Sequence, residues 1–178
     1  EGGGQVGDTG RLTASGLLVE VEDCKKLPSG HYLHMGVVKE GFLEVGQAVT
    51  AQVDEERRLA IQRNHTATHL LHKALREVLG THVHQAGSLV APDRLRFDFT
   101  HTGPMTPEEI AAVEAMVNRK IAAAEAVGWR EMPLDEARSL GAMALFGEKY
   151  GDVVRVVEVG DGWSRELCGG CHVSNTSQ

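Results

Sequence analysis

Residues 54–80 of the chain read DEERRLAIQRNHTATHLLHKALREVLG. This stretch has the pattern of a long helix over 55–79, and the glycine at 80 suits a C-terminal cap. At about 100° per residue, His65, His69 and His72 share one stripe of the helix. Nearly opposite lie small and apolar residues: Ala67, Leu71, Ala74 and Val78. The pattern therefore predicts that these imidazoles lie outside the apolar core.

The sequence pattern changes near residue 55, where short strand-like segments give way to the long helix. The strand-like segments before the helix are at 16–21, 31–39 and 47–54, with turn signals between them. The elements expected after it are a hairpin over 88–99, a helix over 106–126, and strands at 153–159 and 163–167. The predicted class is α+β, with helices packed on a mainly antiparallel sheet. We expect residues 1–55 to form a small β-barrel module and residues 56–178 a second domain.

A second cluster of chemically active residues, Cys168-Gly-Gly-Cys171-His172, follows the first about a hundred residues later. His65 and His69 are one helical turn apart, so both imidazoles can reach a single ion. Imidazole and thiolate together suit Zn²⁺. The second cluster has three donors for the two remaining positions of a tetrahedral set. Spacing leaves open which donors bind, and whether the site is closed and structural or open and catalytic.

Two other readings of these clusters are weaker. The second cluster matches the CxxCH pattern of covalent haem attachment, but that function requires an oxidising compartment and leaves the histidine pair unused. The first resembles the HExxH helix of zinc peptidases, although Thr66 stands where that motif has its glutamate base. Amide hydrolysis is therefore disfavoured, whereas a reactive ester demands less activation of water.

Composition limits the classes of function. The 178 residues are 42% hydrophobic and carry a formal net charge of −7, which argues against a binder of nucleic acid over its whole surface. Local basic groups remain on the long helix, at 57, 58, 63, 73 and 76, as an RNA-contacting or simply solvated face. We find neither a membrane segment nor a signal peptide, and three cysteines favour a reducing, cytoplasmic location. Cys24 is expected to be a buried bystander.

Several stretches, in this order, carry a family resemblance: 2–8 (GGGQVGD), 64–71 (NHTATHLL), 80–82 (GTH), 85–89 (QAGSL), 95–99 (LRFDF), 141–150 (GAMALFGEKY) and 166–170 (ELCGG). Together they resemble the editing domain of alanyl-tRNA synthetases, which freestanding alanyl-tRNA editing proteins share. The likeness covers nearly the whole chain, and the first stretch resembles the glycine-rich segment that leads into the family's small β-barrel. The resemblance implies a piece of a longer synthetase.

This resemblance implies a zinc-dependent hydrolase that removes serine, and also glycine, from mischarged alanine tRNA. The implied Zn²⁺ ligands are His65, His69, Cys168 and His172, and the implied amino-acid pocket includes Gln85 as a catalytic-site residue. Cys171 stands where the family usually has threonine, which adds a competing thiolate.

The implied partners are the acceptor end of tRNA(Ala) and the remaining domains of the synthetase, with neither a membrane nor DNA. An alternative is a tRNA-binding module in which zinc only stabilises the fold. A third reading is a catalytically inactive fragment.

Overall fold

A computed structural model describes residues 3–27, 29–144 and 150–178. The N-terminal third contains β1 (Gly10–Ala14), β2 (Leu17–Lys26), β3 (Tyr32–Glu40) and β4 (Thr50–Val53). The central part contains α1 (Glu55–Leu79), β5 (Gln85–Val90), β6 (Leu95–Phe99) and α2 (Pro107–Ala122). The C-terminal part contains β7 (Val127–Pro133), α3 (Leu134–Ser139), β8 (Val153–Val159) and β9 (Ser164–Leu167). Helices and antiparallel sheets together confirm the α+β class.

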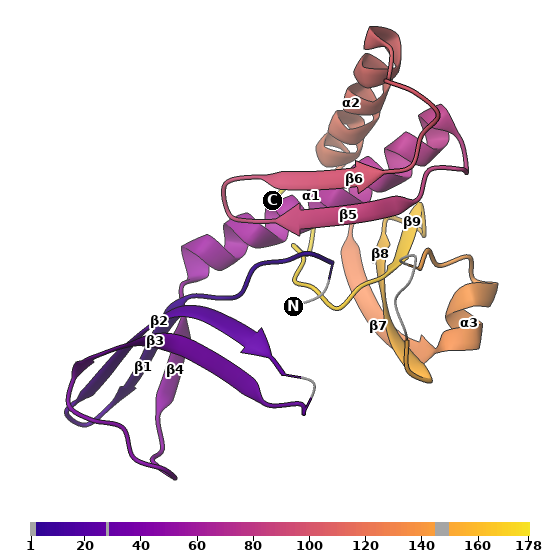
Figure 1. Ribbon diagram of the computed structural model, residues 1–178. Helices are drawn as coiled ribbons and strands as arrows, with labels where there is room; N and C mark the ends of the chain where they lie inside the picture. Colours follow the sequence, from indigo (N-terminus) through magenta and orange to yellow (C-terminus); the bar gives the residue numbers. More distant parts are fainter. Residues whose placement is uncertain (1–2, 28, 145–149) are drawn as a thin grey trace.

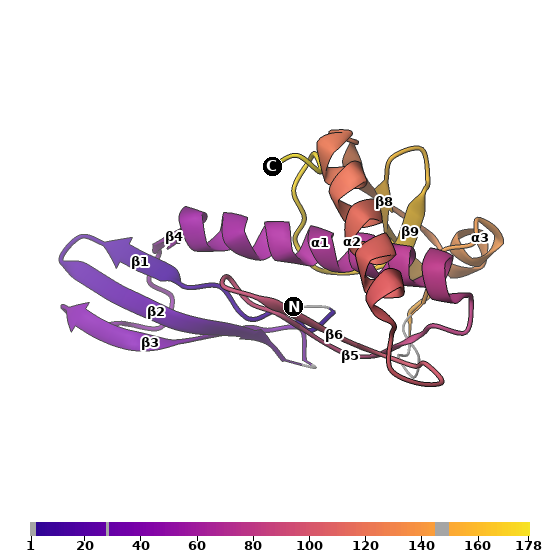
Figure 2. The same ribbon diagram turned by 90° about the horizontal axis from the view of Figure 1, so that it is seen from above.

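Helix α1 is the element around which the others are arranged (Figure 1). It begins at Asp54, whose carboxylate accepts a hydrogen bond from the Arg57 backbone N–H at 3.0 Å. It ends at Gly80, whose φ of 118° is in the region that favours glycine. Its contacts are with α2, β5, β6 and β9. In Figure 2 the four-stranded sheet lies toward the N-terminal end of α1, and β8 and β9 lie toward its other end.

The histidine stripe of α1 is buried, so the prediction that it lies outside the core was wrong. His65, His69 and His72 are 2%, 4% and 5% exposed. The helix is covered on both sides, because α2 packs on one part of its surface while β9 and the segment after it cover the stripe. A polar stripe on a helix can be buried when another part of the chain covers it with polar groups of its own.

The N-terminal strands form an open antiparallel sheet in the order β3-β2-β1-β4. The predicted small β-barrel is therefore not found in the described residues, where β3 and β4 are the two edges of the sheet. Four strands, one of them only four residues long, are too few to close around a core. Exposed apolar side chains gather on β3 and on the connection to β4, among them Tyr32, Phe42 and Val45.

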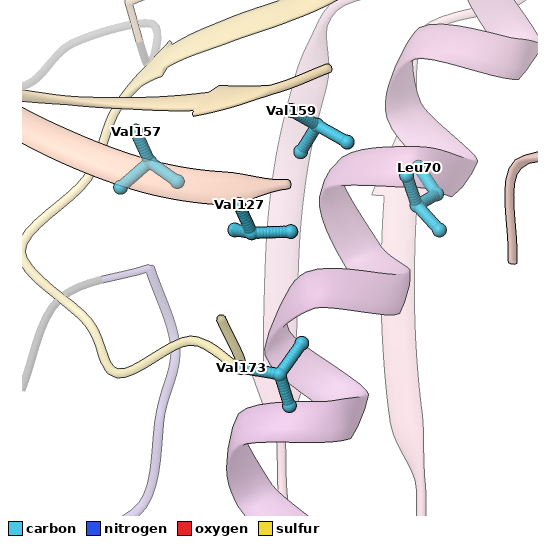
Figure 3. Close-up of a cluster of buried hydrophobic side chains, with 5 residues drawn as sticks. All are labelled: Leu70, Val127, Val157, Val159 and Val173. Atoms are coloured by element: carbon cyan, nitrogen blue, oxygen red, sulfur yellow. The ribbon is translucent and has the colours of Figure 1, made fainter. Parts of the chain in front are cut away.

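The C-terminal sheet, in the order β7-β8-β9, packs against α1. Figure 3 shows Leu70 of α1 beside valines of this sheet and of the C-terminal segment: Val127, Val157, Val159 and Val173. The strands predicted at 153–159 and 163–167 match β8 and β9 closely. Neither β7 nor α3 was predicted.

Helix α2 and the hairpin β5-β6 cover another part of α1 (Figure 1). A capping box of Thr106 and Glu109 begins α2, which ends at Ala122 rather than near the expected residue 126. On α2, Val113 is 5% exposed, whereas Ile110 is 51% exposed. The glycine-rich residues 3–6 precede the N-terminal sheet and run beside β5, where the Val90 N–H donates to Gly4 O at 2.9 Å. Residues 145–149 of the predicted motif at 141–150 lie outside the described residues.

Candidate metal centre

Four side chains from two distant parts of the sequence meet between α1 and the segment that follows β9. His65 and His69 lie one turn apart on α1, and Cys168 and His172 follow β9. Each offers one ligand atom, and these atoms all lie within 4.8 Å of one another. The Cys168 Sγ atom is 3.3 Å from His65 Nε2 and 3.5 Å from His172 Nε2. The group could hold a metal ion.

The second cysteine of the motif lies outside this group of four. Its backbone faces the centre instead, because the Cys171 N–H donates a hydrogen bond to Gln5 Oε1 at 2.9 Å. The structure thus brings Cys168, and not Cys171, to the three imidazoles.

The C-terminal segment approaches α1 closely because it contains glycine where a side chain would not fit. A Cβ atom at Gly170 would overlap the His65 ring, whereas one at Gly169 would meet open space. Arg155 of β8 donates from Nη1 to Gly170 O at 2.7 Å and stacks on the Trp129 ring, with its Cζ atom 4.5 Å from the ring centroid. These contacts fix the backbone that carries Cys168.

Gln5 is a buried residue of this site that the sequence analysis missed. Its Oε1 atom accepts hydrogen bonds from His65 Nδ1 at 2.8 Å and from the Cys171 N–H. The proton is thereby held on Nδ1, so the lone pair of His65 Nε2 points toward Cys168 Sγ. The glycine-rich stretch was the sequence signal that this segment approaches other groups closely. A Cβ atom at Gly3 would lie 2.9 Å from His65 Nε2.

Thr66, which replaces the glutamate of the HExxH pattern, supports another imidazole. Its Oγ1 atom hydrogen-bonds His172 Nδ1 at 3.2 Å and accepts from the Val173 N–H at 3.3 Å. His65 and His172 therefore share one arrangement, in which Nδ1 is held by an oxygen and Nε2 faces Cys168. Such outer contacts orient imidazoles that bind metals.

The environment keeps the three imidazoles neutral. Burial, with smaller effects from His69 and Arg155, lowers the pKa of His65 from 6.5 to about 3. Burial is also the main cause that lowers the pKa of His69 and of His172. The Nδ1 atom of His69 is buried without a hydrogen-bond partner in the described part of the chain. A neutral, buried, unpartnered imidazole nitrogen is suited to bind a cation.

His72 belongs to a neighbouring buried pair. Its Nδ1 atom lies 3.2 Å from Glu166 Oε2, and both side chains are 6% exposed. Ser164 Oγ lies 3.4 Å from the other carboxylate oxygen of Glu166. His72 is thus an internal partner of β9, one turn of α1 beyond the cluster of four.

Gln85 is not one of the four clustered residues. It begins β5, pairs with Phe99 of β6 across an irregular register, and is partly buried. The hairpin contacts α1 on the side of His72, where the Phe97 ring lies 5.0 Å from the His72 ring.

Comparisons with known proteins identify the class to which this architecture belongs. Residues 1–57 match the family model described as tRNA synthetases class II (A). Residues 154–178, which contain Cys168 and His172, match the model described as Threonyl and Alanyl tRNA synthetase second additional domain. Both models describe aminoacyl-tRNA synthetases.

Curated relatives narrow the class further. The chain is 65% identical over 178 residues to an alanine–tRNA ligase of Acetivibrio thermocellus, with 100% of this chain and 20% of that protein covered. It is 60% identical over 183 residues to that of Thermus thermophilus, covering 100% of this chain and 21% of the relative. It is 55% identical over 178 residues to the alanine–tRNA ligase of Bacillus subtilis, with 100% of this chain and 20% of that protein covered. Over its whole length the chain matches one segment of alanine–tRNA ligases, and it spans about a fifth of the length of these relatives.

The described residues contain no helix with the length and apolar character needed to cross a membrane.

Replacing Gln5 with alanine is expected to weaken metal binding by about 10- to 100-fold, because His65 loses the acceptor that fixes its tautomer. Gln5→Glu keeps a carbonyl-type acceptor and should retain most of the affinity. Competition against a chromophoric chelator, with Zn²⁺ as the probe ion, measures both. Gln52→Ala, at an exposed position of β4, is the matched control. Equal affinities for Gln5→Ala and this control would contradict the positioning role.

Proposed function

We propose that this chain binds Zn²⁺ through His65, His69, Cys168 and His172 and hydrolyses the aminoacyl ester of alanine tRNA mischarged with serine or glycine. One observation carries the proposal: three imidazoles and a thiol converge within 4.8 Å in a chain that matches one segment of alanine–tRNA ligases. The acceptor end of the tRNA is then the partner of this site.

The donor set fits Zn²⁺. Three imidazole nitrogens and one sulfur are ligands that zinc prefers, and four is its usual number in a tetrahedral site. The nitrogens at the centre are neutral, as ligation requires, and Gln5 and Thr66 hold two of the rings from outside. Residues 1–55 and 56–178 would form two units, with residues 3–6 of the first docked beside the centre in the second.

Hydrolysis of the aminoacyl ester requires little acid–base catalysis from the protein. The substrate is an ester, which water attacks more readily than an amide, so the missing glutamate at Thr66 is not an obstacle. When bound, the metal would act as a Lewis acid and stabilise the negative charge that develops on the carbonyl oxygen of the ester. Gln5, Thr66 and Arg155 keep the residues around this point in place.

Gln85 is proposed to contact the amino acid of the substrate. Its side-chain amide carries both a donor and an acceptor, which suit the hydroxyl of serine or the α-amino group. A second, hydrolytic site is needed because a pocket for alanine cannot strongly exclude glycine, and a single added hydroxyl is also difficult to reject.

A second candidate is a tRNA-binding module in which the ion is structural. It is favoured by the same four side chains, because four protein ligands complete a closed tetrahedral shell. The two candidates differ in turnover. Hydrolysis of seryl-tRNA(Ala), with alanyl-tRNA(Ala) spared, by the purified chain at full zinc occupancy supports editing. Binding without hydrolysis at full occupancy supports the structural role.

Cys168→Ala is expected to remove zinc and to lower the rate of seryl-tRNA(Ala) hydrolysis by more than about 100-fold, because it deletes a ligand rather than an outer contact. Cys171→Ala is the matched control, since its thiol lies outside the group of four. Zinc content and deacylation rate are measured on the same samples. If Cys171→Ala loses the metal while Cys168→Ala keeps it, the ligand assignment is wrong by three residues.

Gln85→Ala is expected to slow serine removal about 10-fold while zinc content stays at the wild-type level, because one hydrogen bond to the substrate is lost. The measurement is single-turnover deacylation of seryl-tRNA(Ala), with Gln52→Ala as the control for an exposed glutamine. An unchanged rate would remove Gln85 from the proposed pocket. A parallel loss of zinc would mean that the residue supports the centre instead.

A further inference from the structure

A basic cavity lies beside the proposed centre, between the C-terminal half of α1, the β8-β9 turn and the segment after α3. Its volume is about 170 Å³, and its charged lining consists of Lys73, Arg76 and Arg165. Within the described residues, no carboxylate lines it. The rest of the lining includes Gly141, Gly162 and Trp163. The proposed chemistry of the metal centre does not use any of these groups.

The two guanidinium groups of the cavity are held in fixed positions. Arg76 donates from Nη1 to Thr81 O at 3.0 Å and to Val83 O at 2.5 Å. Arg165 donates from Nε to Glu158 at 2.6 Å and from Nη1 to Leu140 O at 3.3 Å. These hydrogen bonds leave the Nη2 groups of both side chains with donors for a ligand. Anchored cations lose little conformational entropy when they bind an anion.

The β8-β9 turn is shaped to make room for one of these cations. Gly162 has a φ of 79°, and a Cβ atom there would overlap the guanidinium of Arg165. Lys73 adds a more mobile charge, since it is 28% exposed and its only described partner is Glu77, at 3.2 Å. Lys120, whose Nζ atom pairs with Glu125 at 2.8 Å, lies outside the lining, 4.5 Å from the centroid of the Trp163 ring.

The cavity is close to the centre along two elements. Arg76 is seven residues beyond His69, which is about 10 Å along a helix. Arg165 is three residues before Cys168, which is about 10 Å along a strand. The phosphates nearest the 3′ end of a polynucleotide lie at comparable distances from its terminal ribose, so a strand whose terminal ribose lies at the centre has the length to reach the cavity.

We propose that Lys73, Arg76 and Arg165 form a binding site for phosphodiester groups of the single-stranded 3′ end of the tRNA. This inference rests on the proposed function and names the part of the substrate held beside the centre. The net charge of −7 repels RNA from most of the surface, so attraction must come from places where positive charge is concentrated. Contacts to phosphates fix the register of the strand and therefore place its terminal ester.

Lys73→Gln is the variant of choice, because Arg76 and Arg165 also bond to backbone carbonyls and their loss would disturb the fold. Lys39→Gln is the matched control: it removes the same charge on β3, where the lysine pairs with Glu20 at 3.0 Å. The probes are an acceptor-stem RNA hairpin with an unpaired 3′ end and the same hairpin without that end. Circular dichroism and zinc content check that each variant is folded.

Lys73→Gln should weaken binding of the hairpin with the 3′ end by about 3- to 10-fold at low salt and lower the slope of log K against log salt by about 0.7. The control should bind as the wild type does, and the hairpin without the 3′ end should hardly distinguish the variants. With the seryl-hairpin as substrate, the loss should appear in KM rather than in kcat. Equal binding by Lys73→Gln and Lys39→Gln, or equal losses on both RNAs, would overturn the proposal.

The two proposals fail in different ways. If the wild-type chain with full zinc does not hydrolyse the seryl-hairpin, yet Lys73→Gln still weakens binding of the 3′ end, editing fails and the phosphate site stands. If the wild type hydrolyses it and Lys73→Gln leaves KM, affinity and salt slope unchanged, editing stands and the phosphate site fails.

Discussion

The structure depends on the meeting of one helix with one short C-terminal segment at a group of four buried or partly buried side chains that could hold a metal ion. Three neutral imidazoles and a thiol are enclosed there, and burying such polar groups without strong partners is costly. A cation shared by all four would offset that cost and join residues about a hundred positions apart in the sequence. The surrounding contacts from Gln5, Thr66 and Arg155 all serve this junction.

Helix α1 carries residues of both proposed sites. Its middle turns present His65 and His69, and its next turns present Lys73 and Arg76 on the same side. Strand β9 runs beside it, with Arg165 near the basic cavity and Cys168 after its end at the centre. Under the two proposals, one rigid pair of elements would hold an RNA strand by its backbone and place its ester at the centre.

Much of the local structure could be predicted from the sequence, because its signals are short-range. The caps at Asp54 and Gly80 bound α1, and turn-forming glycines separate β8 from β9. The cluster of four was also accessible, since helical spacing pairs two imidazoles and the family resemblance supplies the other two donors. What failed depended on contacts distant in the sequence. Burial of the histidine stripe needs β9 to cover it, and the role of Gln5 needs a hydrogen bond across sixty residues. Whether four strands close into a barrel is likewise decided by tertiary geometry.

The most direct test of the central claim is X-ray absorption at the zinc edge of the purified chain. The account predicts a stoichiometric ion with a first shell of nitrogen at about 2.0–2.1 Å and a single sulfur at about 2.3 Å, unchanged in Cys171→Ala. Two sulfur scatterers, or a first shell of oxygen alone, would contradict the assignment of Cys168 with three imidazoles.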